Sequence, residues 1–241
     1  MTYVDRVPVN WAGFSQIRAE LSLLKCAVKK KYDYYHLVSG ADLPIKTQDE
    51  IHQFFDSNNG LEFIGIDNLS AETYEYQERI QYYRFFQDFI GRSEDRLSCF
   101  LRSVEQVLLK FQKWVGVDRT RKISCKIYKG SQWFSITHGM VEFILSKEKD
   151  IFSIFQYGLG VDELFVQTIA MNSPYRQNIA NDSLRYIDWE HGSPYTFTAE
   201  DYSLLMNSDK LFARKFDEKK DFQIVARIRE RIETNYDSEN N

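Results

Sequence analysis

Two adjacent carboxylates are the first residues of this chain that could do chemistry. Asp162 and Glu163 stand in "VDELFVQT", directly before the apolar residues Leu164, Phe165 and Val166. In one interpretation they begin a helix, with Asp162 as the cap and Glu163 at the favourable end of the helix dipole. In the other, a general base is held at the edge of a cleft. These residues alone favour the helix start, because structural carboxylates outnumber catalytic ones.

Cationic side chains inside apolar runs are the second set of candidates. Arg185 lies in "LRYIDW", and Arg214 and Lys215 lie between apolar residues in "LFARKFD". If the second run is a strand, alternation turns one of its two cations inward. A buried cation needs an anion, which is either a carboxylate of the chain or the diphosphate of a ligand. The pattern leaves both partners open.

Two turn-like segments carry residue types that recognise sugars. In "SGADLPIKT", Asp42 precedes a proline bend, where it either accepts hydrogen bonds from sugar hydroxyls or stabilises the bend as an Asx-turn. In "KGSQWFSIT", Ser131, Gln132 and Trp133 follow a glycine, and Gln132 and Trp133 suit hydroxyl recognition and ring stacking. A hairpin turn with Trp133 in the core explains the same residues equally well.

Bulk composition narrows the classes of function. The chain has 241 residues, a net charge of −4 and 15% aromatic residues. Its negative charge argues against a general nucleic-acid partner, despite the local basic stretch "RTRKISCKIYK". Abundant rings are typical of clefts that stack on sugars, although a core rich in Tyr and Phe explains them too. The patterns GxGxxG, GxxxxGK[ST], GxSxG and Asp-x-Asp are all absent from the sequence. We therefore expect no metal and no other cofactor.

The cysteines and the hydropathy indicate a cytoplasmic protein. Cys26, Cys99 and Cys125 stand far apart without a CxxC pair, which fits a reducing compartment. The sequence shows neither a signal peptide nor an apolar run long enough to cross a membrane. Peripheral contact with the inner face of a membrane stays open.

The hydrophobic pattern predicts an α/β fold, with one domain over residues 1–235 and a polar tail at 236–241. Predicted helices cover residues 15–30, 47–55, 71–113 with a break near Gly91, 139–147, 162–172, 198–206 and 221–235. Predicted strands cover residues 34–40, 61–67 and 184–189, with two more around a turn at Gly130 within residues 124–137. Thr47 and Glu50 form a capping-box pattern.

Six segments, taken in order, resemble the core-2/I-branching glycosyltransferase family. They are "VNWAGFSQIRAELSLLK", "YDYYHLVSGADLPIKTQDEI", "KGSQWFSIT", "VDELFVQTIAMNS", "LRYIDW…GSP" and "SDKLFARKFD". This family includes β-1,6-N-acetylglucosaminyltransferases and peptide O-xylosyltransferases. The segments span nearly the whole chain, so the resemblance is specific for the family, although not for the donor sugar.

The resemblance implies an A-type glycosyltransferase fold, which is Rossmann-like, and an inverting, metal-independent reaction. The donor would be a UDP-sugar, and the acceptor would be a hydroxyl of a glycan or of a lipid-linked saccharide. Glu163 stands at the position of the family's general base, which leaves Asp162 as the helix cap. Arg185 and Lys215 stand at the positions of the cations that bind the diphosphate.

The remaining matches concern the sugars. Asp42, Ser131, Gln132 and Trp133 fall where the family contacts the donor or acceptor sugar. Arg79, in "YQERIQYY", resembles the family's acceptor-side arginine. A solvated helix face explains Arg79 nearly as well.

The sequence also departs from the family pattern. Family members carry a strand–helix–strand unit before the "NWAGFSQ" segment, and this sequence begins too late to include it. The membrane anchor and paired cysteines of the animal enzymes are missing as well, so we expect a bacterial type of enzyme that acts in polysaccharide biosynthesis. N-acetylglucosamine is the first donor we expect, and xylose is the next. The alternative is a truncated relative that binds sugar without catalysis.

Overall fold

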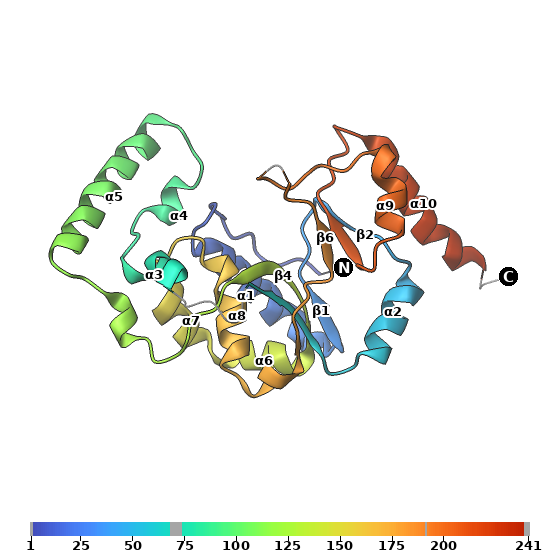
Figure 1. Cartoon of the computed structure of the whole chain (residues 1–241), viewed down its shortest axis with the longest axis horizontal. Coiled ribbons are helices and arrows are strands. Elements are labelled where there is room, and N and C mark those ends of the chain that lie inside the picture. Colours follow the sequence, from blue (N-terminus) through green and yellow to red (C-terminus); the bar gives the residue numbers. More distant parts are fainter. Residues whose placement is uncertain (1, 68–73, 191, 239–241) are drawn as a thin grey trace.

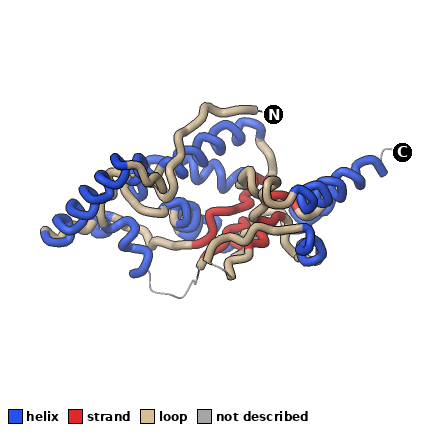
Figure 2. The backbone as a smooth tube through the Cα atoms, turned by 90° about the horizontal axis from the view of Figure 1, so that it is seen from above, coloured by secondary structure: helices blue, strands red, loops and turns tan. Residues whose placement is uncertain are grey.

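The computed structural model describes residues 2–67, 74–190 and 192–238, and within them the chain is a mixed α/β fold. Two sheets stand next to each other, with helices on either side of the strands (Figures 1 and 2). The α/β class predicted from the sequence is confirmed.

The first sheet has the strand order β1-β4-β3-β5. These strands are β1 (Tyr34–His36), β4 (Gly130–Thr137), β3 (Glu62–Ile66) and β5 (Ile179–Ala180). Only the pairing of β3 with β5 is parallel. The main core packs this sheet against α1 (Ser15–Ala27), α6 (His138–Ser146) and α8 (Phe165–Met171).

The second sheet has the order β2-β7-β6 and its own apolar core. The strands are β2 (Asp42–Pro44), β7 (Phe212–Arg214) and β6 (Arg185–Ile187). They pack with α9 (Tyr202–Met206) and α10 (Phe222–Ser238), through residues such as Phe197, Leu205 and Ile224. Helix α10 continues to Ser238, so it includes the first residues of the predicted polar tail, and residues 239–241 lie outside the described part.

Four further helices complete the fold. They are α2 (Gln48–Ser57), α3 (Tyr74–Gln81), α5 (Arg96–Trp114) and α7 (Glu148–Phe155), with the short α4 (Gln87–Ile90) between α3 and α5. Of these, α7 and α3 bury Ile151, Phe155 and Ile80 in the main core. Thr47 and Glu50 form the predicted capping box at the start of α2. The predicted helix over residues 71–113 is interrupted at Gly91, as expected, although residues 71–73 are outside the described part. Helix α5 forms the outer edge of the molecule at the left of Figure 1.

The predicted hairpin within residues 124–137 is wrong. Residues 124–129 form no strand, and Gly130 begins β4 instead of turning the chain. A Cβ atom on Gly130 would overlap the carbonyl oxygen of Gly65 on β3. The glycine is therefore needed for the close approach of two strands, which from sequence alone has the same appearance as a turn.

Arg185 connects the two sheets from inside the protein. Its side chain starts from β6, and its guanidinium donates to the carbonyl oxygens of Leu37, Phe134 and Ser183 and to Oγ of Ser135. The residue is only 6% exposed. Its guanidinium also lies over the ring of Phe212 on β7, 4.5 Å from the centroid. One side chain thus holds the end of β1, strand β4 and the second sheet together.

We expect the substitution Arg185→Met to lower the free energy of unfolding by roughly 3 kcal/mol, because it leaves several buried oxygens without a donor. Urea unfolding followed by circular dichroism measures this loss. Arg229→Met is the matched control, since Arg229 makes an exposed ion pair with Glu218, and its effect should stay within about 0.5 kcal/mol. Equal losses in both variants would contradict the bridging role of Arg185.

Candidate active site

Glu163 is the centre of the candidate site. It ends a short 3-10 turn, Val161–Glu163, immediately before Leu164 and α8. Its side chain is 40% exposed, and its Oε2 lies 2.8 Å from Nη1 of Arg79. Among the residues that the structure describes, Oε1 has no partner. The structure therefore joins two residues predicted from separate segments, and it leaves one oxygen of the carboxylate open.

Arg79 makes hydrogen bonds with the loop that precedes Glu163. The guanidinium also donates to the carbonyl oxygen of Gly160, at 3.1 Å, and the carbonyl of Arg79 accepts from the N–H of Leu159. Gly160 has a φ of 60°, and a Cβ atom there would lie 3.0 Å from the arginine Nη1. A side chain at Gly160 would be strained and would push on the arginine.

Asp162 does not cap a helix, so that prediction is wrong. Gly160 precedes the 3-10 turn and Leu164 precedes α8, and neither helix start shows a side-chain cap. The carboxylate of Asp162 instead accepts from Nε2 of Gln16 on α1, at 3.0 Å. Burial and the neighbouring charge of Glu163 raise the pKa of Asp162 to about 6. The hydrogen bond from Gln16, on a distant helix, thus takes the place of the predicted cap.

A second buried acid lies behind Asp162. Glu20 of α1 is 5% exposed, and its Oε1 accepts from Nε2 of Gln132 at 2.9 Å. The other oxygen is buried without a hydrogen-bond partner in the described part of the chain. Burial raises the pKa of Glu20 to about 8, so the group is mostly a neutral acid at pH 7. The amide of Gln132, predicted to contact a sugar, is in contact with this acid instead.

Asp42 is in an internal ion pair. Its Oδ1 lies 2.8 Å from Nη1 of Arg214, and its side chain is 2% exposed. Its Oδ2 accepts from the N–H of Ser39, three residues earlier, so it stabilises the preceding turn and forms no Asx-turn with the described residues that follow. The register of β2 with β7 places Asp42 opposite Arg214. The structure therefore provides the salt bridge that the sequence left open, with a partner that the sequence could not identify.

Trp133 lies on the other side of this ion pair. The guanidinium of Arg214 stands over the indole of Trp133, 4.7 Å from the ring centroid, and the tryptophan is 9% exposed. Ser131 accepts from the backbone N–H of Trp133 through Oγ. Residues 131–133 thus connect two clusters, because Gln132 binds Glu20 while Trp133 packs on Arg214.

The two predicted diphosphate ligands differ in availability. The guanidinium of Arg185 is buried, donates four hydrogen bonds to protein oxygens, and has its pKa lowered to about 9 by burial. The ammonium of Lys215 is partly exposed and has no partner among the described residues. Of these two cations, Lys215 is the one whose charge has no partner in the described part of the chain, and the guanidinium of Arg185 is bound within the fold.

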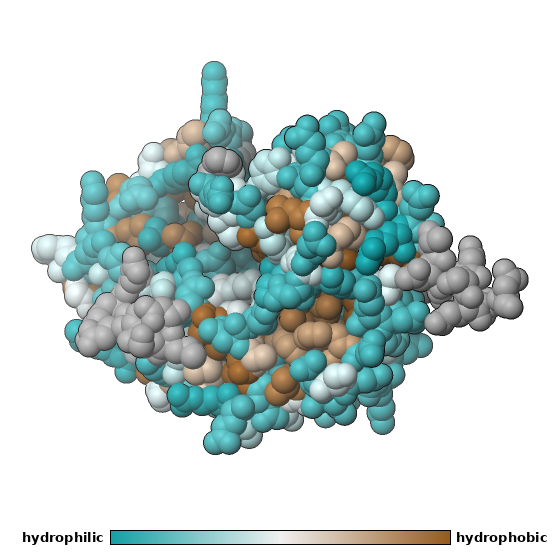
Figure 3. Space-filling model, turned by 45° about the vertical axis from the view of Figure 1, so that its right-hand side comes forward, coloured by the Kyte–Doolittle hydropathy of each residue, from teal (hydrophilic) through white to brown (hydrophobic). Residues whose placement is uncertain are grey.

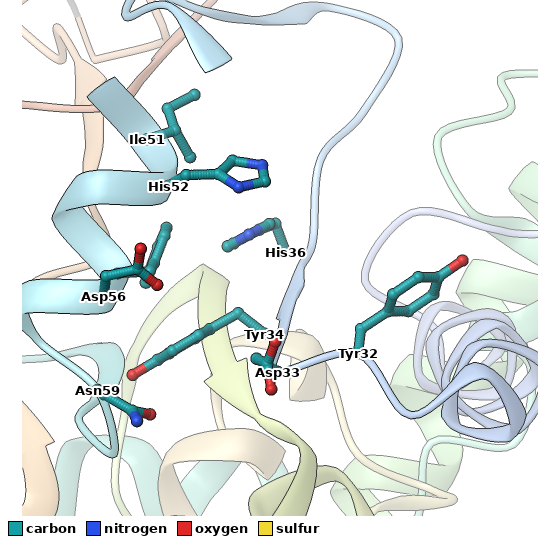
Figure 4. A pocket seen from close by; sticks show the side chains of 9 residues that line it. Tyr32, Asp33, Tyr34, His36, Ile51, His52, Asp56 and Asn59 are labelled. Carbon is teal, nitrogen blue, oxygen red and sulfur yellow. The ribbon is translucent and has the colours of Figure 1, made fainter. Parts of the chain in front are cut away.

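Two depressions lie near the first strand. The larger, about 810 Å³, runs between α1 and β1 and is lined by Glu20, Leu24, Tyr35 and Phe134 among others. The smaller, about 280 Å³, lies between α2 and β1, where His36, His52 and Asp56 surround it (Figure 4). Burial lowers the pKa of His36 to about 4, so this imidazole is neutral at pH 7.

Hydrophilic residues cover most of the face in Figure 3, with hydrophobic residues gathered in patches near its middle. Within residues 2–67, 74–190 and 192–238, no group of three or more His, Cys, Asp or Glu side chains is placed to hold a metal ion. The predicted independence from metal stays a prediction.

Comparison with known proteins decides the family. The model of the Core-2/I-Branching enzyme family matches residues 1–206, which include Glu163, Arg79 and Arg185. The chain belongs to this family. The resemblance found in the sequence is confirmed, and with it the Rossmann-like glycosyltransferase fold. Lys215 lies beyond the residues that the family model matches.

Several curated relatives of this family member align along most of the chain. "Xylosyltransferase 1" of Rattus norvegicus is 22% identical over 96% of the chain and 28% of its own length. "Xylosyltransferase oxt" of Drosophila pseudoobscura pseudoobscura is 21% identical over 97% of the chain and 27% of its own length. "Beta-glucuronosyltransferase GlcAT14A" of Arabidopsis thaliana is 23% identical over 77% of the chain and 40% of its own length. The chain thus spans well under half the length of these relatives.

The buried acid Glu20 predicts how stability depends on pH. Its pKa is about 8 in the folded protein and 4.5 in its ordinary state, so the folded protein holds a proton that the unfolded chain releases. The contribution of Glu20 to the free energy of unfolding should therefore be highest below pH 4.5 and fall as the pH rises towards 8. Glu20→Gln should flatten this fall and be more stable than the wild type above pH 8.

Urea unfolding across this pH range measures the effect. Asp162 contributes a fall of the same sign between pH 3.8 and about 6, which the Glu20 variant should retain. Glu94→Gln, a change at an exposed glutamate, is the control and should keep the full slope. A Glu20→Gln variant with the slope of the wild type would show that Glu20 is ionised in the folded protein.

Proposed function

We propose that this chain is the catalytic part of an inverting glycosyltransferase that moves a sugar from a UDP-sugar to a hydroxyl of a glycan or lipid-linked saccharide. The observation that carries the proposal is the geometry of Glu163. One carboxylate oxygen is fixed by Arg79, and the other has no partner within the described residues. An oriented, partly exposed carboxylate with one free oxygen is what proton removal from an acceptor hydroxyl requires.

Arg79 acts as the residue that positions this base. Its guanidinium binds Oε2 of Glu163 and the carbonyl of Gly160, so it fixes both the side chain and the loop that carries it. It is itself 32% exposed along its side chain, which leaves donors available for an acceptor hydroxyl. In this proposal Arg79 therefore positions the base and also contacts the acceptor, as predicted from the sequence.

The leaving UDP needs positive charge at its diphosphate. Lys215 meets this need, because its ammonium is unpaired among the described residues and it follows directly on Arg214 at the end of β7. Arg185 contributes indirectly by holding the two sheets in place. A direct contact of Arg185 with the diphosphate would require it to exchange hydrogen bonds that it already makes inside the protein.

The donor sugar stays open between three classes. The resemblance of the motifs favours N-acetylglucosamine first. The names of the relatives, two of them xylosyltransferases and one a glucuronosyltransferase, favour xylose or glucuronic acid. Release of UDP from UDP-N-acetylglucosamine, UDP-xylose and UDP-glucuronic acid, each with a saccharide acceptor, distinguishes these donors.

Glu163→Gln should reduce transfer by about 10²–10⁴-fold, because the amide keeps the shape of the side chain but cannot accept the proton. UDP release with the best donor measures the rate, and calorimetry should show UDP affinity almost unchanged. Glu200→Gln, at an exposed glutamate before α9, should leave the rate as in the wild type.

Two results would count against this mechanism. Turnover like that of the wild type in Glu163→Gln would remove Glu163 from the role of base. A wild-type protein that binds saccharides and releases no UDP from any donor would instead identify a sugar-binding relative without catalysis.

We expect EDTA to leave the transfer rate unchanged within about twofold, because the proposed stabilisation of the diphosphate relies on the ammonium of Lys215 and not on a metal ion. The assay compares UDP release before and after dialysis against EDTA, with added Mn²⁺ as the reverse test. A loss of activity that Mn²⁺ restores would show that a metal ion stabilises the leaving group.

A further inference from the structure

Helix α5 turns its apolar side away from the protein. Large apolar residues recur along it every three or four positions, which gives one continuous stripe. The most exposed members of this stripe are Leu97 (65%), Phe100 (62%), Val107 (65%), Phe111 (55%) and Trp114 (81%). Leu101, Val104 and Leu108 lie between them and are partly exposed. A stripe of this width would normally face a core.

The side of α5 that faces the protein is unusually polar. Its buried residues are Ser98, Glu105, Leu109 and Gln112. Glu105 accepts from the backbone N–H groups of Phe85 and Phe86, and Gln112 exchanges two hydrogen bonds with the backbone of Tyr83. Hydrogen bonds to the chain that follows Arg79 therefore hold the helix in place, and the apolar stripe is left unpartnered.

The charged residues of α5 are also divided between its inner and its outer side. Glu105 is the only acidic residue between Arg96 and Trp114, and it faces inward, 6% exposed. The helix also carries four cations, of which three are exposed and Arg102 is partly exposed: Arg96, Arg102, Lys110 and Lys113. Lys113 pairs with Glu78 of α3, and Arg102 donates to the carbonyl oxygen of Ser93. Arg96 and Lys110 are therefore the cations of α5 without a partner among the described residues, in a chain whose net charge is −4.

Two large apolar residues close to α5 in the sequence are exposed as well. Phe89 on α4 is 73% exposed, and Val115, directly after α5, is 48% exposed. In the segment Arg119–Lys122 that follows, Arg119 is buried, while Lys122 is exposed and Arg121, paired with Asp118, is exposed along 76% of its side chain. None of the helices in the described part of the chain is long and apolar enough to cross a membrane.

We propose that α5 lies on the surface of an anionic lipid bilayer, with the stripe from Leu97 to Trp114 in the acyl boundary and its cations at the headgroups. An apolar face with Trp, Phe and Leu next to a Lys- and Arg-rich polar face is the pattern of an interfacial helix. The excess of exposed cations over anions argues for a negatively charged partner. It argues against a second copy of α5, whose cations would face like charges.

Co-sedimentation with lipid vesicles tests this surface on the full chain. One vesicle population contains phosphatidylcholine and phosphatidylglycerol in equal parts, and the other contains phosphatidylcholine alone. The wild type should sediment with the anionic vesicles, and much less with the neutral ones. Added salt should weaken the difference between them.

Variants separate the apolar from the ionic contribution. Phe111→Ser with Trp114→Ser should weaken binding at least tenfold, because two rings no longer enter the bilayer. Lys110→Gln should weaken it about fivefold, which is the effect of one cation near an anionic surface. Both changes are at exposed positions, so the fold should be retained, and circular dichroism checks this.

Matched controls come from the opposite end of the molecule. Leu204→Ser with Phe222→Ser removes exposed apolar residues, 51% and 61% exposed, from α9 and the start of α10 (Figure 1). Lys219→Gln removes an exposed cation there. Both controls should bind vesicles like the wild type.

Three outcomes would overturn the proposal. One is a wild type that stays in the supernatant with anionic vesicles. Another is an equal loss in the α5 variants and the controls. The last is self-association of the wild type that the Phe111 and Trp114 changes abolish without any vesicle binding, which would make the stripe an interface between copies of this chain.

Discussion

The buried guanidinium of Arg185 is the constraint on which the arrangement of this protein depends. It places a positive charge between two sheets, where carbonyl oxygens, one hydroxyl and the ring of Phe212 surround it and no carboxylate of the described residues forms an ion pair with it. Such a group is costly to bury unless its donors are satisfied. Because its acceptors come from β4, from the residue after β1 and from Ser183 just before β6, the requirement fixes how the two sheets meet.

The pairing of Asp42 with Arg214 rests on that arrangement. The pair is formed across β2 and β7 in the second sheet, while Trp133, against which Arg214 packs, belongs to the first sheet. Lys215 follows on the same strand end, so its position is set by the same contacts. Arg185 thus holds together the two sheets that carry these residues.

Three acidic side chains near α1 differ in burial and in their hydrogen-bond partners. Glu163 is paired and half-exposed, Asp162 is buried with its pKa raised to about 6, and Glu20 is buried deeply enough to have a pKa of about 8. Only Glu163 combines exposure with a free carboxylate oxygen. The two buried acids, Asp162 and Glu20, accept hydrogen bonds from Gln16 and Gln132, respectively. This difference in environment, and not in residue type, distinguishes Glu163 from the two buried acids.

The sequence by itself determined the features that depend on residues close to one another in the chain. The capping box at Thr47, the strand at residues 62–66 and the break of the helical region near Gly91 all follow from neighbours within a few residues, and the family followed from motifs in order. Only the tertiary structure decided the partners. Arg79 meets Glu163 across 84 positions and Asp42 meets Arg214 across 172, and no spacing rule connects them. Asp162 and Gly130 were misread for the same reason, because a contact with a distant segment outweighed the local pattern that each of them shows.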